Sequence, residues 1–284
     1  MKNIIVLLLA FIAYANVGFC QEKGLFYEIS GNGLVAPSYL FGTIHLICEE
    51  DFYLGQQVLE KVKSSQNLVL EINLDDPNMM QVVFSNINNP SGEKITDYLN
   101  DDQFDATQAF LKENASVDIN MMKSMRPFML LSMLYPKILD CETKAYELEL
   151  MKIAKQNEIS IRGLESIEDQ LAVFENIPLE EQYKNLYDYV LDFEKGRRDF
   201  LQLIETYRSK DIERMVEMVS ESPEYKNYQG ILLDDRNHNW LSPMMAMMKE
   251  GNMFFAVGAG HLGGENGMVN LLRKEGYTVT VLEE

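Results

Sequence analysis

Two histidines in matching local settings are the first candidates for chemistry in this sequence. Gly42 stands three residues before His45, Gly258 stands three residues before His261, and each motif closes an apolar run. A single histidine of this kind is more often a local hydrogen-bonding residue at a strand end. Because the chain has only three histidines and two share this setting, we interpret the pair as the seat of chemistry. The third, His238, is expected to face solvent.

Acidic residues near the ends of predicted strands supply the second kind of group. Glu71 interrupts the apolar run 67–73, and Glu165 follows the short run 159–164. Two imidazoles and a carboxylate are a common ligand set for a divalent metal that keeps a position open for water. We therefore predict His45, His261 and Glu71 as metal ligands. Glu71 is alternatively the general base, or a strand-end residue in solvent, and Glu165 is a second candidate acid.

A late polar segment, Asp235-Arg236-Asn237, adds a cation. On a helix Arg236 shares a face with Trp240, and its planar guanidinium suits an oxyanion or a carboxylate. The alternative is the start of a surface helix held by ion pairs. Pro243 is expected to end or kink this helix near Leu241. The methionines of 244–248 read as core residues.

The glycines around His261 permit another interpretation, because residues 258–263 match the G-x-G-x-x-G pattern of dinucleotide-binding proteins. Exported proteins rarely meet free nicotinamide cofactor. We therefore expect Gly42, Gly258 and Gly260, together with Asn237, to support turns in the site, and no cofactor of that class.

The elements that must position these residues alternate along the chain. Strands are expected at 24–30, 38–45, 67–73, 159–164, 253–257 and 277–282, and helices at 49–64 and 266–274. The order of strand, helix and strand over 38–73 predicts a β-α-β unit with a parallel pair. Helical patterns fill about 76–157 and 166–250. We predict one α/β domain over 21–284, with a mixed, partly parallel sheet and a large helical insertion.

Residues 1–20 have the basic start, apolar run and small residues of a secretory signal peptide. We expect export to the periplasm or the medium, and disfavour lipoprotein anchoring at Cys20 because Phe19 precedes it. The formal net charge of −19 argues against nucleic-acid or anionic membrane partners, and no later segment is apolar enough to span a membrane. Cys48 and Cys141 are candidates for a disulfide in an exported protein, but the sequence leaves that bond open.

The motifs together resemble those of the TraB/GumN-like family, which includes the TIKI proteins that cleave Wnt ligands. The resemblance covers nearly all of the chain after residue 20, and its marks are 40–45, Leu70-Glu71, 163–166 with Gln170, 235–237 with Trp240, and 258–262. Asp235 stands where the family often has glutamate.

This resemblance implies a fold like that of the erythromycin-esterase/ChaN group and hydrolysis of a peptide or small protein that depends on manganese or cobalt. Carried over by motif, it assigns roles to His45, His261, Glu71 and Arg236. The competing hypothesis is a protein of the same fold that binds a peptide, haem or another metal-bearing ligand without catalysis.

Overall fold

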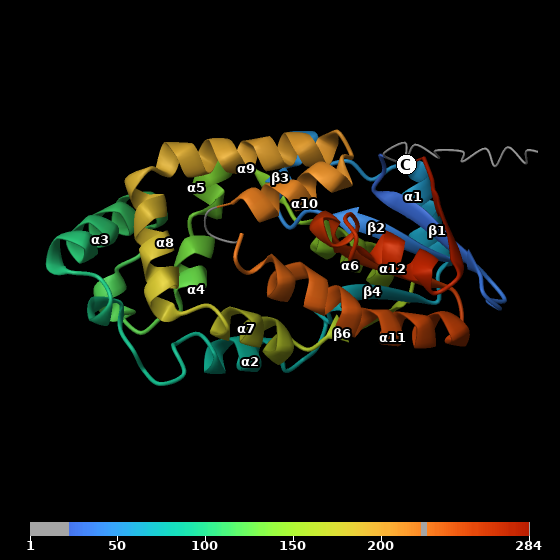
Figure 1. Ribbon diagram of the computed structural model, residues 1–284, viewed down its shortest axis with the longest axis horizontal. Helices are drawn as coiled ribbons and strands as arrows, with labels where there is room; N and C mark the ends of the chain where they lie inside the picture. The colour runs from blue at the N-terminus through green and yellow to red at the C-terminus, as the bar shows by residue number, and fades with distance from the viewer. Residues whose placement is uncertain (1–22, 223–225, 284) are drawn as a thin grey trace, which may run out of the picture.

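The computed structural model describes residues 23–222 and 226–283 (Figure 1). The predicted signal peptide lies outside the described residues. The centre of the fold is a six-stranded sheet with the order β6-β4-β7-β2-β1-β8. Its strands are β1 (Phe26–Gly31), β2 (Ser38–Thr43), β4 (Asn67–Ile72), β6 (Ser160–Glu165), β7 (Met253–Gly258) and β8 (Tyr277–Val281).

The sheet is mixed, as the sequence predicts. β6, β4, β7 and β2 run parallel, whereas β1 pairs antiparallel with both β2 and β8. Central strands β2 and β7 are buried almost throughout, which explains why both are rich in apolar residues. The α/β class is thereby confirmed, and the closer likeness to the erythromycin-esterase/ChaN group stays a prediction.

The late strand β7 lies between two early strands. β2 and β4 are parallel, as predicted, but they are not neighbours, because β7 pairs with both of them. Thr43 stands opposite Gly258, and Ile72 stands opposite Glu165 on β6. The carboxyl ends of four parallel strands therefore meet at one edge, where ligands gather in α/β sheets.

The helices fall mostly between β4 and β7 in the chain. The first group comprises α2 (Met79–Ser85), α3 (Asp101–Ala115), α4 (Pro127–Ser132), α5 (Tyr135–Leu139) and α6 (Tyr146–Gln156). The second comprises α7 (Ile167–Glu175), α8 (Leu179–Leu191), α9 (Phe193–Arg208), α10 (Ile212–Glu221) and α11 (Asp235–Glu250). α1 (Gln56–Ser64) and α12 (Met268–Lys274) lie outside these groups, and α1 begins seven residues later than expected because 49–51 form a 3₁₀ turn instead.

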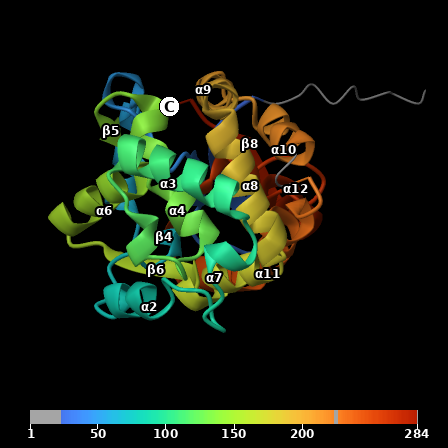
Figure 2. The ribbon, with the colours of Figure 1, turned by 90° about the vertical axis from the view of Figure 1, so that its left-hand side faces the viewer.

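Two hydrophobic cores hold these layers. One surrounds the sheet, and the other joins α3, α4 and α8 beyond the carboxyl edge of the strands. Figures 1 and 2 show these helices gathered at the end of the molecule away from β1 and β8. The middle helices therefore extend past the strand ends and build the surroundings of the site.

Of the two alternatives expected at Pro243, an end or a kink of the helix near Leu241, the end does not occur. α11 continues from Asp235 to Glu250 with Pro243 inside it. Trp240, Met244 and Met248 are almost fully buried on both sides of the proline. Burial of such side chains contributes about 1.5–3 kcal/mol each, which together exceeds the roughly 3 kcal/mol cost of an internal proline. The methionines are core residues, as the sequence predicts.

A small ribbon with a disulfide closes one side of the site. β3 (Ile47–Cys48) pairs antiparallel with β5 (Thr143–Lys144), two strands too short to be visible in the sequence pattern. The bond left open by the sequence is present: Cys48 and Cys141 are joined, with their Cα atoms 5.7 Å apart. Ribbon and disulfide tie the chain after β2 to the start of α6.

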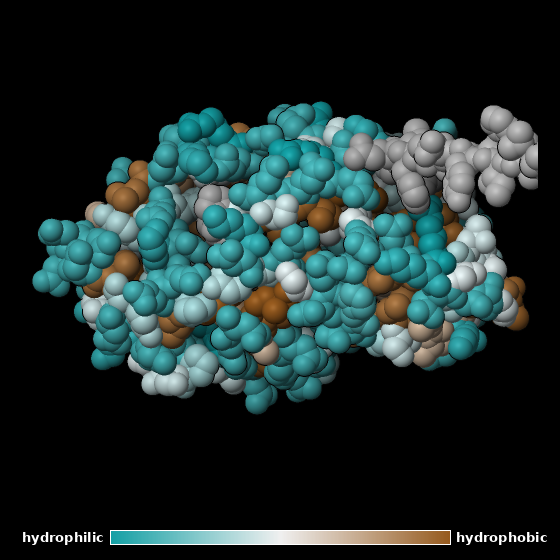
Figure 3. Space-filling view, in the orientation of Figure 1, coloured by the Kyte–Doolittle hydropathy of each residue, from teal (hydrophilic) through white to brown (hydrophobic). Residues whose placement is uncertain are grey.

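The surface agrees with the acidic composition. Figure 3 shows a face covered mostly by hydrophilic residues, with apolar residues in small separate groups. Within residues 23–222 and 226–283, no helix has both the length and the apolarity that a membrane crossing requires.

Candidate functional site

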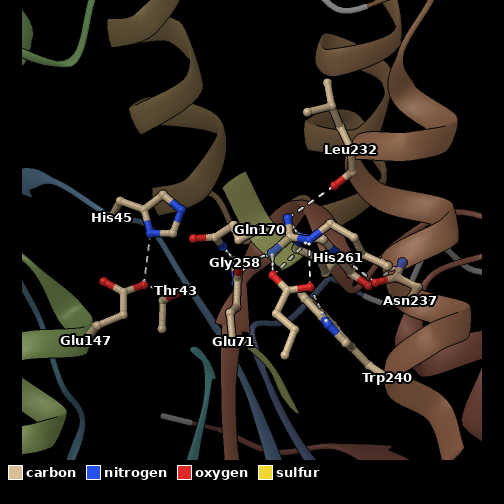
Figure 4. A network of polar contacts seen from close by, with 12 residues as sticks. Thr43, His45, Glu71, Glu147, Gln170, Leu232, Asn237, Trp240, Gly258 and His261 are labelled. Atoms are coloured by element: carbon tan, nitrogen blue, oxygen red, sulfur yellow. Dashed lines mark hydrogen bonds and ion pairs between the residues drawn. The ribbon is translucent and has the colours of Figure 1, made fainter. Parts of the chain in front are cut away.

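The edge where the parallel strands end brings together the residues that the sequence singled out. His45 follows β2, Glu71 lies near the end of β4, Glu165 ends β6, and His261 follows β7. Arg236 reaches them from the first turn of α11. Figure 4 shows Glu71, Asn237, Trp240 and His261 gathered together, with His45 to one side beside Glu147.

Arg236 is the centre of the buried part of this site. Its Nη2 donates to Glu71 Oε2 at 2.5 Å and to Glu165 Oε1 at 2.6 Å, and its Nε also donates to Glu165. Its Nη1 donates to the Leu232 carbonyl at 3.2 Å and to His261 Nε2 at 3.1 Å. All five N–H groups thus have acceptors. To bind an oxyanion, Arg236 would first have to release one of them.

Glu71 is fixed by donors on both of its oxygens. Oε1 accepts from the Gly258 N–H at 2.7 Å, while Oε2 accepts from Gln170 at 3.2 Å and from Arg236. Burial alone would raise the pKa of Glu71. The electrostatic interactions with His261 and with Arg236 outweigh burial and lower the pKa to about 2. A carboxylate this acidic is a weak general base at neutral pH.

Gly258 donates its N–H to Glu71 and also leaves space for the carboxylate, because it has no side chain. A Cβ at this position would lie 3.2 Å from Glu71 Oε1. Glycine therefore lets the β7 backbone approach the carboxylate closely enough to bind it. The same argument holds for Gly42, where a Cβ would lie 2.6 Å from Leu262 of the other Gly-x-x-His turn. A Cβ at Gly260 would meet nothing closer than 3.8 Å, so no close approach requires that glycine.

His261 is an internal residue of the network. Only 5% of its side chain is exposed. Because a guanidinium group only donates, Nε2 accepts from Arg236, and Nδ1 must then donate to Asn237 Oδ1 at 2.8 Å. Asn237 donates in turn to the carbonyls of His261 and Asn266. Burial chiefly, and Arg236 in addition, lower the pKa of His261 to about 3, so the ring is neutral.

Glu165 and Trp240 complete the network. Trp240 Nε1 donates to Glu165 Oε2 at 2.9 Å, and the guanidinium carbon of Arg236 lies 4.7 Å from the Trp240 ring centre. The predicted shared helix face of Arg236 and Trp240 is therefore correct, and the side chain of Arg236 is only 12% exposed. Two carboxylates share one guanidinium beside a neutral histidine, which leaves one net negative charge.

His45 stands apart from this network. Its side chain is 72% exposed, and its Nδ1 lies 3.1 Å from Oε1 of Glu147, on α6. Thr43 donates to the same oxygen at 2.7 Å. The hydrogen bond to Glu147 raises the pKa of His45 above its ordinary value of 6.5. Figure 4 shows the other ring nitrogen on the side away from Glu147.

Two pockets flank the site. The first, of about 310 Å³, has His45, Glu71, Glu147 and Gln170 as its polar lining and Leu70, Ile72, Leu74, Ala145 and Leu148 as its apolar lining. The second, of about 440 Å³, is lined by Glu165 and Arg236 among others. The buried network is therefore a wall of both pockets, whereas His45 opens into the first alone.

Glu147 is the residue of this site that the sequence reasoning missed. It lies in the first turn of α6 between two further acids, Glu142 and Glu149, and no motif distinguishes it from them. Only the nearby Cys141 gave a signal, since a bond to Cys48 would bring this segment close to His45.

The predicted metal ligands match manganese or cobalt in kind, because histidine nitrogen and carboxylate oxygen suit both ions. Their arrangement does not match a ligand set. His261 Nε2 and Glu71 Oε1 are 3.9 Å apart, but both residues bind Arg236. In the described part of the chain, no three or more His, Cys, Asp or Glu side chains are grouped to hold a metal ion.

Comparisons with known proteins give one result. No curated protein and no solved structure matches the chain. The model of the TraB/PrgY/gumN family matches residues 25–281, which include every strand of the sheet and every residue of the site. Because the match extends over nearly the whole length, the chain belongs to the TraB/PrgY/gumN family.

Proposed function

We propose that this protein is an exported hydrolase that cleaves peptide bonds in the pocket beside His45. The observation that carries the proposal is the exposed imidazole, held at Nδ1 by a carboxylate, at a pocket of about 310 Å³. A histidine oriented in this way, with its second nitrogen open to a pocket, is the usual arrangement of a general acid–base group.

The proposed reaction uses His45 for proton transfer. Above the raised pKa of His45, about 9, the imidazole is neutral, and Nε2 accepts a proton from a water molecule as that water attacks the carbonyl carbon of the substrate. The carbon–nitrogen bond then breaks, and the same proton passes to the leaving amine. Glu147 stabilises the imidazolium ion that forms between these steps, because its carboxylate accepts from Nδ1. The apolar lining offers a surface for an uncharged part of the substrate beside the bond.

The buried network supports this reaction as a rigid wall. Glu71 presents a fixed negative charge to the pocket, and Arg236 with Glu165 holds it in place. Export is supported by the disulfide between Cys48 and Cys141, since such bonds persist in oxidising compartments. Dependence on manganese or cobalt stays a prediction from the family resemblance. Metal analysis of protein purified without a histidine tag tests it.

The test of function is cleavage of a peptide library followed by mass spectrometry, with and without added manganese or cobalt. We expect fragment pairs that together equal one substrate plus one water. His45→Ala should remove these products, whereas His238→Ala should not, because His238 is exposed and its ring bonds the carbonyl of Asp234, just before α11. Intact peptides in every arm would overturn the proposal and favour the non-catalytic binding protein.

A further inference from the structure

Glu147 is placed to control the direction of the His45 ring. It is the second residue of α6, its side chain is 14% exposed, and its Oε1 accepts from both His45 and Thr43. The amino end of a helix stabilises an anion, which favours the ionised carboxylate at this position. The charge that faces His45 is therefore permanent at neutral pH.

The hydrogen bond decides which nitrogen of His45 carries a proton. An ionised carboxylate only accepts, so Nδ1 must be the donor. In the neutral ring the lone pair then lies on Nε2. No hydrogen bond to Nε2 is found among the described residues, and the ring borders the pocket. Without Glu147 an exposed imidazole would exchange between both tautomers and turn about its side-chain bonds.

Backbone pairing and the disulfide hold His45 and Glu147 close to each other. His45 lies two residues before β3, and Glu147 lies three residues after β5. Ile47 pairs with Lys144 and Cys48 with Thr143 in this ribbon, and the disulfide fixes the same segments. Thr43 adds a third constraint from the end of β2, because it binds the oxygen that His45 binds. The position of Glu147 is thus set by both chain segments and not by an isolated surface contact.

We infer that Glu147 is a positioning residue that holds His45 in the Nδ1–H form and directs Nε2 into the pocket. The inference rests on the proposed function only for the kinetic consequence of that positioning. Glu147 does not contact the reacting atoms, and its effect passes through the imidazole.

Nitrogen NMR of protein labelled with ¹⁵N-histidine tests the positioning directly, because three histidines give three resolvable ring systems. The measurement is made with a chelator present, at a pH where His45 is neutral. We expect the Nδ1–H tautomer for His45 in the native protein. Glu147→Ala should yield a mixture of tautomers, Glu147→Asp should do the same because its shorter side chain falls out of reach, and Glu147→Gln should retain Nδ1–H through the amide oxygen.

The matched control is Glu149→Ala, since Glu149 lies in the same first turn of α6 but pairs with Lys152. It should leave the His45 signals unchanged. An unchanged Nδ1–H tautomer in folded Glu147→Ala would overturn the inference. If that variant does not fold, Glu147→Asp decides in its place, and retention of Nδ1–H there overturns the inference as well.

Kinetics separate the inference from the proposed function. On a peptide that the protein cleaves, Glu147→Ala should lower kcat about 10- to 100-fold with little change in KM, as expected for loss of a partner that orients a histidine. Glu147→Gln should retain more activity than Glu147→Ala. A tautomer change without any cleavage by the native protein would leave the positioning role intact and remove the hydrolase proposal. Cleavage by the native protein, with an unaltered His45 tautomer in Glu147→Ala, would support the hydrolase proposal and remove the positioning role of Glu147.

Discussion

The two Gly-x-x-His turns are similar in sequence but opposite in environment. His45 is 72% exposed, bonds a carboxylate, and has a raised pKa. His261 is 5% exposed, accepts from a guanidinium group, and has a pKa lowered to about 3. The same local motif therefore supplies one histidine that faces the pocket and one that belongs to the protein interior.

The difference arises from what each turn meets. The turn after β7 is enclosed by α10, α11 and β2, so that His261 is bounded by Asn237 and Trp240. The turn after β2 continues into the short ribbon at the pocket rim. The two motifs also differ in backbone, because 259–261 form a 3₁₀ turn whereas His45 lies in a bend. The charge state of each histidine then depends on its neighbours.

The largest expected effect separates the two histidines by function. His45→Ala should lower the rate of peptide cleavage about 10²- to 10⁴-fold, the range for a lost acid–base group, and should lower the free energy of unfolding less than His261→Ala does. Steady-state kinetics and urea unfolding of one protein preparation measure both. Equal losses of stability in His45→Ala and His261→Ala would show that the two environments do not differ as described.

Removal of Arg236 should destabilise the buried network around His261 and leave the surroundings of His45 unaffected. Arg236→Met leaves Glu71 and Glu165 buried without a counter-ion, and loss of a buried partner costs about 3–5 kcal/mol. Arg162→Met is the control, because Arg162 pairs with the exposed Glu250 and should cost less than about 1 kcal/mol. Urea unfolding measures both. Similar costs for the two variants would contradict a buried network.

Loss of the disulfide should affect the exposed His45 and the ribbon beside it. Cys48→Ser combined with Cys141→Ser should lower the free energy of unfolding by about 2–4 kcal/mol. In the folded variant, the His45 nitrogen signals should change because the ribbon loses one of its links, while the His261 signals remain. NMR of the double variant is the measurement. Unchanged signals from both histidines would show that the ribbon alone holds His45.

Through the buried His261, acid should lower the free energy of unfolding by about 1.4 kcal/mol per pH unit or less. The folded pKa of His261 is lowered from 6.5 to about 3, so below pH 6.5 the unfolded chain binds a proton that the folded protein does not. Stability is therefore lost as pH falls from 6.5 towards 3, and Glu71 adds to this loss below 4.5. His45 acts in the opposite direction, because its raised pKa contributes stability that is lost as pH rises through the folded value.

Urea unfolding between about pH 7 and pH 4.5 measures this slope. His261→Asn should flatten it, since asparagine does not titrate, while His238→Ala should leave it as in the native protein. A native protein whose stability does not fall in this range would refute a neutral, buried His261.

The sequence by itself determined the six strands of the main sheet, the parallel arrangement of β2 and β4, the core methionines of α11, and the placing of His45, Glu71, Glu165 and His261 at one edge of the sheet. These follow from hydrophobic periodicity and from the rule that parallel strands end at one edge. Tertiary structure alone decided that β7 lies between β2 and β4, that α11 continues through Pro243, and that Glu147 binds His45. Each depends on contacts between segments distant in the chain, whose burial and hydrogen bonds outweigh local preference, and no local pattern records them.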